Sequence, residues 1–378
     1  MAKVAIKSIY SKMSFITEKT NKISTIIVPT GEEPTLVIIG VSHKEAKLEE
    51  RETFSLNESE IELLSNDLSK QEAIEECLVL NTCNRLEIYS YLKQGFELKS
   101  IQQFITSHPT LRDSLFLKYH FVKTQTQAIE HSFELAAGLA SQMIGETEIL
   151  GQIKNAYKNA QYSKFSNTRL TRLLEKSFQA AKIIRTQTRI SRGQVSIGTV
   201  AVHLATRIFG NIKESRILLI GSGFVSEKTA QALKTKGVTD ITVTSRSKDK
   251  NHKLSEKFSA ASIHFHDIKN QIKHYDIVIS STSSTETIIG LECIEDAIKK
   301  RPNRPLFLID LAVPRDIEES IANLKNIHLY NLDALATIAN ENIEQRKLEL
   351  NRAKQIVKSR AWNFWLKSQR QILYRKIQ

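Results

Sequence analysis

"SRILLIGSGFVSEKTAQALKTKGVTDITVTSRS", residues 215–247, decides the fold class of this chain. Four consecutive apolar residues lead into a glycine-rich turn, which is followed by a helical pattern and then by a second apolar segment. A strand, a tight turn, a helix and a second strand at this spacing form the first unit of a parallel sheet with helices on its faces. The stretch therefore predicts an α/β domain in this part of the chain.

The turn of this unit is similar to a phosphate-binding loop. Gly221 and Gly223 match the first two glycines of the G-x-G-x-x-G pattern, and Ser226 stands at the third. The first glycine permits the tight turn, the second lets a pyrophosphate approach the backbone at the start of the helix, and the third only sets helix packing. Its position between a strand and a helix favours a dinucleotide site, with an ordinary α/β turn as the alternative. The predicted contacts are Gly221, Ser222, Gly223, Phe224, Val225 and Ser226.

The end of the second strand indicates which dinucleotide binds. An NAD site presents an Asp or Glu there to the ribose hydroxyls. This chain has the sequence "SRSK" at 245–248 instead. Two cations and two hydroxyls suit a 2′-phosphate, so the predicted cofactor is NADPH, with a solvated basic turn as the alternative. The predicted contacts are Ser245, Arg246 and Lys248.

Hydrophobic patterns divide the rest of the chain around this unit. The α/β domain is predicted to span residues 191–325, because "YDIVISSTSS" and "LFLIDLAVPRDI" supply further strands. Before it, short apolar strands and long helical patterns predict an α+β catalytic domain over residues 35–190, preceded by a Lys/Ser/Thr-rich tail at 1–34. Residues 326–378 are expected to form a helical spine. The expected fold class is α/β multidomain.

The spine is predicted to be one long helix from Leu332 onward. Apolar residues recur mostly at helical spacing, at 335, 339, 343, 350, 353, 357, 361 and 364. A helix with a single apolar stripe must bury that stripe against another surface, so we expect the helix to pack on a partner chain or on the chain's own domains.

Composition sets the class of partner and compartment. The 378-residue chain has a formal net charge of +13 and a pI near 9.5. Lysines and arginines gain affinity for polyanions by releasing phosphate counterions, so the charge is compatible with a nucleic-acid partner, but on its own it favours a solvated basic surface or a basic proteome. Three scattered cysteines predict a reducing compartment, no disulfide framework and no metal site. We expect a cytoplasmic protein without a membrane span, or a plastid one if the tail is a transit segment.

One cysteine stands apart from the other two. In "LVLNTCNRLEIYSY", residues 78–91, Cys83 follows an apolar strand and lies where a loop can expose it. A thiolate is a nucleophile, and the nearby guanidinium of Arg85 can lower the pKa of the thiol. Cys77 lies at the start of the apolar run and is interpreted as a residue that packs in the hydrophobic core. A buried-core role for Cys83 is the alternative.

A glycine-interrupted helical pattern follows at residues 131–157. Gly138, Gly145 and Gly151 each cost about 1 kcal/mol in a helix interior relative to alanine. Three such glycines indicate that another group lies close to the backbone at these positions. The polar residues between them predict a pocket for a polar substrate, with solvated side chains as the alternative. These residues are Ser141, Glu146, Glu148 and Gln152.

Six motifs in this order resemble the glutamyl-tRNA reductase family. They are "NTCNRLEIY", "AAGLASQMIGETEILGQIKNAY", "SIGTVAVHLA", "GSGFVSE", "DIVISST" and "DLAVPRDI", and the resemblance covers about residues 35–370. It implies NADPH-dependent reduction of glutamyl-tRNA to glutamate-1-semialdehyde, the first step of five-carbon tetrapyrrole synthesis. It also implies a homodimer joined by the C-terminal helix, and glutamate-1-semialdehyde aminomutase, the next enzyme, as a possible partner.

The resemblance also assigns roles to residues. Cys83 would attack the ester carbonyl and hold a glutamyl thioester, and His131 would assist the leaving ribose hydroxyl or orient the substrate. Without the resemblance, His131 would be interpreted as a helix-surface histidine. The implied substrate contacts are Thr82, Asn84, Arg85 and Ser141, with Glu146, Glu148 and Gln152 lining the same pocket.

The chain departs from the family pattern at a few positions. Ala140 stands where the family usually has aspartate, "GETE" replaces "GEPQ" at 145–148, and the chain stops several turns before the family's C-terminal domain usually ends. One alternative is therefore a diverged, catalytically weak paralogue with a tRNA- or partner-binding regulatory role. Another is an NADP-dependent dehydrogenase of a free small acid, which would need neither a thiol nor a basic surface.

Overall fold

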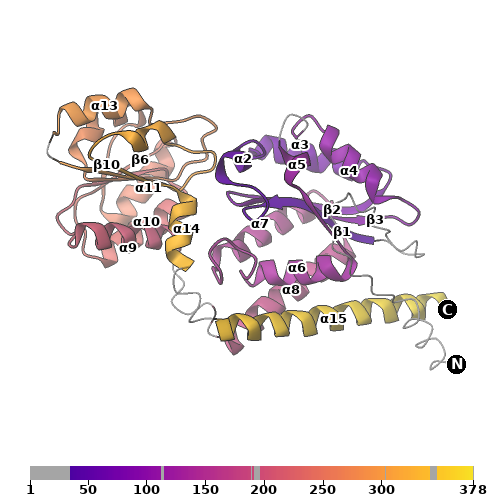
Figure 1. The fold of residues 1–378 in the computed structure, drawn as a ribbon. Coiled ribbons are helices and arrows are strands. Elements are labelled where there is room, and N and C mark those ends of the chain that lie inside the picture. The colour runs from indigo at the N-terminus through magenta and orange to yellow at the C-terminus, as the bar shows by residue number, and fades with distance from the viewer. Residues whose placement is uncertain are drawn as a thin grey trace. The chain divides into compact units, whose positions relative to one another are not determined.

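The computed structural model describes residues 35–111, 115–188, 190, 196–302, 304–340 and 347–377. The tail expected at 1–34 lies outside the described residues. The described chain contains an antiparallel sheet with its helices, a parallel sheet with its helices, and two C-terminal helices (Figure 1). This arrangement confirms the predicted fold class.

The N-terminal part is built on a four-stranded antiparallel sheet with the strand order β2-β3-β1-β4. Its strands are β1 (Thr35–Ser42), β2 (Ile74–Thr82), β3 (Arg85–Leu92) and β4 (Phe121–Thr124). Its helices are α2 (Leu48–Glu52), α3 (Glu58–Ser69), α4 (Leu98–Ser107), α5 (Phe116–Tyr119), α6 (Gln125–Ala136), α7 (Glu148–Tyr162) and α8 (Thr168–Gln187). Every residue of β1 and β3 is buried, because helices cover both faces of this sheet (Figure 1).

The central part is built on a six-stranded parallel sheet with the order β10-β9-β8-β5-β6-β7. Its strands are β5 (Ile217–Ile220), β6 (Ile241–Thr244), β7 (Ala261–Ser262), β8 (Ile277–Ser280), β9 (Leu306–Asp310) and β10 (Ile327–Tyr330). Its helices are α9 (Ile197–Phe209), α10 (Phe224–Thr235), α11 (Lys248–Phe258), α12 (Ile268–Gln271) and α13 (Leu291–Lys299), with short 3₁₀ turns η1 (Phe265–Asp267), η2 (Ile272–His274) and η3 (Glu319–Asn323). The sheet continues past the boundary expected at 325, because β10 pairs with β9.

Strand order fixes where this sheet can bind a ligand. The chain runs outward from β5 to β6 and β7, then returns to β8 on the other side of β5. Loops that leave the carboxyl ends of β5 and β8 therefore diverge, and a crevice forms at this switch point. The glycine-rich turn begins directly after β5, so it lies at the crevice.

In the C-terminal segment the structure describes two helices, where the periodicity predicted one; residues 341–346 of the predicted helix lie outside the described residues. Helix α14 (Leu332–Asn340) contributes Leu332 and Leu335 to the core of the parallel-sheet part. Helix α15 (Lys347–Ile377) contributes Val357 and Phe364 to the core of the antiparallel-sheet part, where it packs on α6 and α8 (Figure 1). The apolar positions at helical spacing thus belong to two different cores, which a pattern along the chain cannot distinguish.

Candidate active site

Cys83 lies in a two-residue turn at an edge where three strands of the antiparallel sheet meet. The turn joins β2 to β3, and Arg85 at the start of β3 pairs with the last residues of both β1 and β2. The backbone carbonyl of Asn84 accepts a hydrogen bond from the N–H of His43 at 3.0 Å. The hydroxyl of Thr82 accepts one from the N–H of Asn84 at 3.2 Å. The turn therefore holds the cysteine outside the strand ladder.

The surroundings of the Cys83 thiol keep it protonated at neutral pH. The side chain is half-buried and packs on the apolar cluster that includes Met143. Burial, together with the carboxylates of Glu146 and Glu148, raises the pKa of the thiol to about 12 against the opposing charge of Arg51. Positive charge brought near the thiol, or a loss of negative charge there, would therefore favour the thiolate.

Arg85 and His131 meet at a buried carboxylate, that of Glu87. The guanidinium donates to Oε1 of Glu87 at 2.5 Å and to the backbone carbonyl of Ala140 at 2.7 Å. The hydroxyl of Tyr89 donates to Oε2 of Glu87 at 2.9 Å, and Nε2 of His131 lies 3.0 Å from both carboxylate oxygens. The charge of Arg85, which we expected to act on the thiol, is thus directed to Glu87.

Glu87 is a site residue that the sequence interpretation missed. Side chains two positions apart on a strand point to the same face, so Arg85, Glu87 and Tyr89 in "RLEIY" were the available signal. Burial alone would raise the pKa of Glu87, but His131 and Arg85 outweigh it and hold that pKa far below its usual value. Because a carboxylate only accepts hydrogen bonds, Nε2 of His131 carries a proton and its Nδ1 is left for another partner.

Two glycines shape the loop between α6 and α7. Gly138 and Gly145 have φ values of 77° and 86°, and the N–H of Gly145 donates to the carbonyl of Gly138 at 2.8 Å. A Cβ on Gly138 would lie only 2.4 Å from the carbonyl oxygen of Glu146. The close approach expected from these glycines is therefore the loop folding on itself. Gly151 alone lies inside a helix, α7.

This loop places two acids near the thiol. Burial raises the pKa of Glu146, while the hydroxyl of Ser141 and the charge of Arg85 oppose the rise. Burial and the neighbouring Glu146 raise the pKa of Glu148 to about 7, against the charge of Lys228. Two partly buried carboxylates with raised pKa values, one of them raised in part by the other, form a site that a cation would stabilise.

A cavity of about 700 Å³ joins the α7 residues to the glycine-rich turn. Its wall on one side includes Glu148 and Gln152 at the start of α7. The opposite wall is formed by the turn and by the loop after β8; from the turn, Gly221, Ser222, Gly223, Phe224 and Val225 line the cavity. Glu148 and Gln152 are the predicted substrate residues that share this space with the predicted cofactor residues. Thr82, Asn84, Arg85, Ser141 and His131 do not line this cavity but gather around the cysteine turn and the Glu87 carboxylate.

The glycine-rich turn has the geometry of a nucleotide loop. Gly221 has φ 111°, and a Cβ there would lie 2.5 Å from the carbonyl oxygen of Ser281. A Cβ on Gly223 would meet no atom within 4 Å, so its backbone is open to a ligand at the start of α10. Ser226 is buried behind the turn, where its hydroxyl lies 2.7 Å from that of Ser281. Ser226 therefore supports the turn and does not line the cavity.

The basic loop after β6 differs from the prediction at one position. Ser245 and Arg246 line the cavity, together with Ser247 and Lys250. Lys248 is not part of the lining, because the chain enters α11 at that residue and each further helical residue turns by about 100° around the axis. Lys250, rather than Lys248, is the lysine in this part of the chain that lines the cavity.

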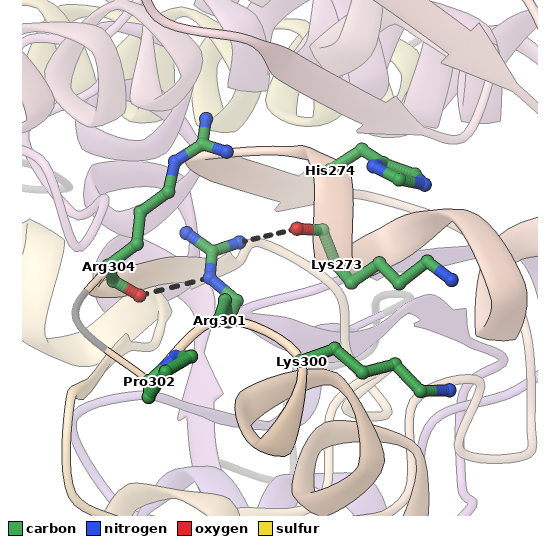
Figure 2. Close-up of a pocket in the computed structure, with 6 residues that line it drawn as sticks. All are labelled: Lys273, His274, Lys300, Arg301, Pro302 and Arg304. Carbon is green, nitrogen blue, oxygen red and sulfur yellow. Dashed lines mark hydrogen bonds between the residues drawn. The ribbon is translucent and has the colours of Figure 1, made fainter.

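A second cavity, of about 570 Å³, is strongly basic but has a structural explanation (Figure 2). Its lining residues are Lys273, His274, Lys300, Arg301, Pro302 and Arg304. The guanidinium of Arg301 donates to backbone carbonyls, including those of Lys273 at 3.3 Å and Arg304 at 3.0 Å (Figure 2). These loops precede β8 and β9, at the amino ends of the strands, whereas α/β sheets bind nucleotides at the carboxyl ends. The cavity is not the dinucleotide site.

A parallel sheet with a glycine-rich turn at its switch point, a basic loop beside it and a cavity shared with a second domain define an NAD(P)-binding oxidoreductase. Comparison with known proteins identifies its family. The family model of the glutamyl-tRNA reductase N-terminal domain matches residues 39–188, and that of shikimate/quinate 5-dehydrogenase matches residues 203–338. The second match covers the nucleotide-binding part.

Curated relatives extend this similarity over most of the chain. Glutamyl-tRNA reductase of Idiomarina loihiensis is 36% identical over 88% of this chain and 79% of its own length. That of Nitratidesulfovibrio vulgaris strain Miyazaki F is 37% identical over 88% of this chain and 76% of its own. A solved structure of the Methanopyrus kandleri enzyme is 28% identical, covers 90% of this chain and 81% of its own, and superposes with a TM-score of 0.49.

The chain belongs to the glutamyl-tRNA reductase family. It is an oxidoreductase of tetrapyrrole biosynthesis that acts on glutamyl-tRNA, as the sequence motifs predicted. This assignment favours the reductase over the regulatory paralogue and the free-acid dehydrogenase. Across the described residues, the structure contains no helix with the length and apolar character of a bilayer span.

Proposed function

We propose that Cys83 is the nucleophile of the reaction. Its sulfur attacks the carbonyl carbon of the ester that joins glutamate to the terminal ribose of tRNA. A carbon–sulfur bond forms, the ester carbon–oxygen bond breaks, and the ribose oxygen takes up the proton that the thiol gave. The glutamyl group is left as a thioester, which accepts a hydride far better than a carboxylate does.

The single observation that supports this proposal most is the cavity shared by α7 and the glycine-rich turn. Glu148 lines that cavity and also acts on the thiol of Cys83. A group attached to the sulfur would therefore lie near the nucleotide loop. Such proximity is what hydride transfer to the glutamyl carbon requires.

The two acids are proposed to recognise the α-ammonium of the glutamyl group. Glu146 and Glu148 both have raised pKa values, so a cation between them would relieve their mutual repulsion. The same cation would offset the negative charge that raises the pKa of Cys83. Binding of the correct substrate would thus favour the thiolate. The remaining proposed contacts are Thr82, Asn84, Arg85, Ser141 and Gln152.

His131 is proposed to hand the proton to the leaving ribose oxygen. Glu87 fixes its Nε2, which leaves Nδ1 for exchange. Glu87 thereby acts as a positioning residue for both His131 and Arg85.

We infer that the cofactor is NADPH. The loop after β6 presents the side chains of Arg246 and Lys250 and the hydroxyls of Ser245 and Ser247 to the cavity, and it has no acid for a ribose 2′-hydroxyl. The open backbone at Gly223 suits a pyrophosphate at the start of α10. When bound, NADPH would supply the hydride that releases the aldehyde.

We also propose the assembly that the family resemblance implies. On α15, Leu348 is 83% exposed and Trp362 is 40% exposed, although the opposite side of the helix is buried in its own chain. These side chains would contact a second copy in a homodimer, and light scattering showing only monomer at micromolar concentration would contradict this. The reactive aldehyde product makes a transient complex with glutamate-1-semialdehyde aminomutase a further proposal.

The domain division is likewise a proposal. A catalytic part ending with α8 and a cofactor part running from α9 through α14 would follow the two cores and the two family matches, with α15 as the helical C-terminal part. Limited proteolysis that cuts first between α8 and α9 would support the first boundary.

The proposed chemistry is tested by trapping the acyl-enzyme. Glutamyl-tRNA labelled in the amino acid, supplied without NADPH, should leave label on the protein that hydroxylamine releases, because thioesters react with amines readily. Addition of NADPH should convert the label to aldehyde. Cys83→Ala should abolish both signals, whereas Cys77→Ala and Cys293→Ala should keep them. Reduction by Cys83→Ala at the wild-type rate would overturn the mechanism.

A further inference from the structure

Arg51 is a buried cation with an incomplete set of partners. It lies in α2, and its side chain is 2% exposed. Nη2 donates to Oδ1 of Asp333 at 2.8 Å, and Nη1 donates to the carbonyl of Ala46 at 3.4 Å. Nε is buried and makes no hydrogen bond within the described part of the chain. A guanidinium that is buried in this way exerts its charge on neighbours more strongly than a solvated one.

The ion pair of Arg51 lies beside the same apolar cluster as the thiol. Asp333 follows Leu332, which is a member of that cluster, and its Oδ1 also accepts from Nε2 of Gln142 at 2.7 Å. Gln142 precedes Met143, another member of the cluster, and Cys83 packs on its surface. The hydrogen bonds thus link Arg51 and Gln142 to Asp333, and the residues next to Asp333 and Gln142 belong to the cluster on which Cys83 packs.

The electrostatics at two neighbouring residues agree with this placement. Arg51 is the cation that opposes the rise in the pKa of Cys83. The side chain of His43, whose backbone is bonded to Asn84, has its pKa lowered to about 3 by burial and then by Arg85, Arg51 and Lys44, while Asp333 acts in the opposite direction. His43 is therefore neutral, and the charge of Arg51 acts on the thiol against those of Glu146 and Glu148.

We propose that the positive charge of Arg51 favours the ionised form of the Cys83 thiol, and that Asp333 limits how strongly this charge acts on the thiol. Arg51 acts through the thiol, so it is a positioning residue rather than a catalytic one. Asp333 lies in α14, after the last strand of the nucleotide-binding sheet, so the helix that follows this sheet tunes the nucleophile of the other part. The inference rests on the proposed role of Cys83 but not on any measurement of turnover.

The test is the pH dependence of alkylation of Cys83 by iodoacetamide, followed at the Cys83 peptide by mass spectrometry. The reagent is neutral, so its own approach does not depend on the charge of the site. Arg51→Gln should raise the apparent pKa and slow alkylation at pH 8 by roughly threefold to tenfold, the change in thiolate fraction for a shift of up to one pKa unit. Asp333→Asn should lower the apparent pKa and speed alkylation at pH 8. Arg51→Lys should keep the apparent pKa and the alkylation rate close to those of the wild type.

Arg315→Gln is the matched control. Arg315 also ties α2 to the nucleotide-binding part, through Nε and Nη2 bonds of 2.9 and 3.0 Å to Glu52, but it is not among the charges that shift the pKa of the thiol. The proposal would be overturned if the apparent pKa of alkylation shifted in the same direction in Arg51→Gln and Asp333→Asn. It would also be overturned by an equal shift in Arg315→Gln, or by an unchanged pH profile in Asp333→Asn. Because Asp333→Asn keeps the size of the side chain, it decides the question even if Arg51→Gln does not fold. Failure of the acyl-enzyme assay with normal alkylation shifts would refute only the role of Cys83.

Discussion

Replacement of Glu87 by glutamine should be among the most destabilising single changes in the catalytic part. Its carboxylate is fully buried and binds Arg85, Tyr89 and His131 at once. Removal of one partner of a buried ion pair leaves the other charge uncompensated, which costs about 3–5 kcal/mol. Arg85→Met combined with Glu87→Leu should recover part of this loss, because a buried pair replaced by apolar groups leaves no unpaired charge.

The measurement is urea unfolding followed by tryptophan fluorescence. Both tryptophans of the chain, Trp362 and Trp365, lie on α15, whose Phe364 contacts Phe133 of α6 at a ring distance of 6.1 Å. Glu227→Gln is the matched control: it removes a pair with Lys257 whose side chains are 57% and 42% exposed, and it should cost about 0–1 kcal/mol. A loss below about 1 kcal/mol in Glu87→Gln would refute the reasoning, because such a value is typical of a solvated pair.

Three further predictions concern cofactor, substrate and pH. NADPH should bind more tightly than NADH, and Arg246→Ala should reduce the difference between the two affinities. Equal affinities of the wild type for NADPH and NADH in a fluorescence titration would contradict this prediction. Binding of tRNA should weaken steeply with added salt, because a chain with a net charge of +13 would bind phosphates by releasing counterions. Binding that does not depend on salt would show that the basic residues do not contact the tRNA phosphates. The raised pKa of Glu148, about 7 against an ordinary 4.5, means that the folded state binds the extra proton, so its contribution to stability is lost as pH rises from about 4.5 to 7. Glu148→Gln should therefore be more stable than wild type at pH 8, by about 1–3 kcal/mol, and not at pH 4.5, in the same unfolding assay.

Local features of the sequence determined much of this protein. A glycine at a positive φ, an apolar run that fits one strand, and a cysteine just beyond a strand are properties of a few adjacent residues. The turn at Gly221 and the exclusion of Cys83 from the strand ladder could therefore be read directly. The same holds for the basic loop at Arg246, because the end of the second strand of a parallel unit always reaches the crevice.

The partners of buried charges were decided only by the tertiary structure. Glu87 and His131 are 44 positions apart, and Arg51 and Asp333 are 282 apart, so no spacing rule joins them. The two C-terminal helices show the same limit, since apolar periodicity says that a face is covered but not by which core. Low-dielectric surroundings make each of these pairings strong, and burial at such positions is a property of the folded chain rather than of any segment of it.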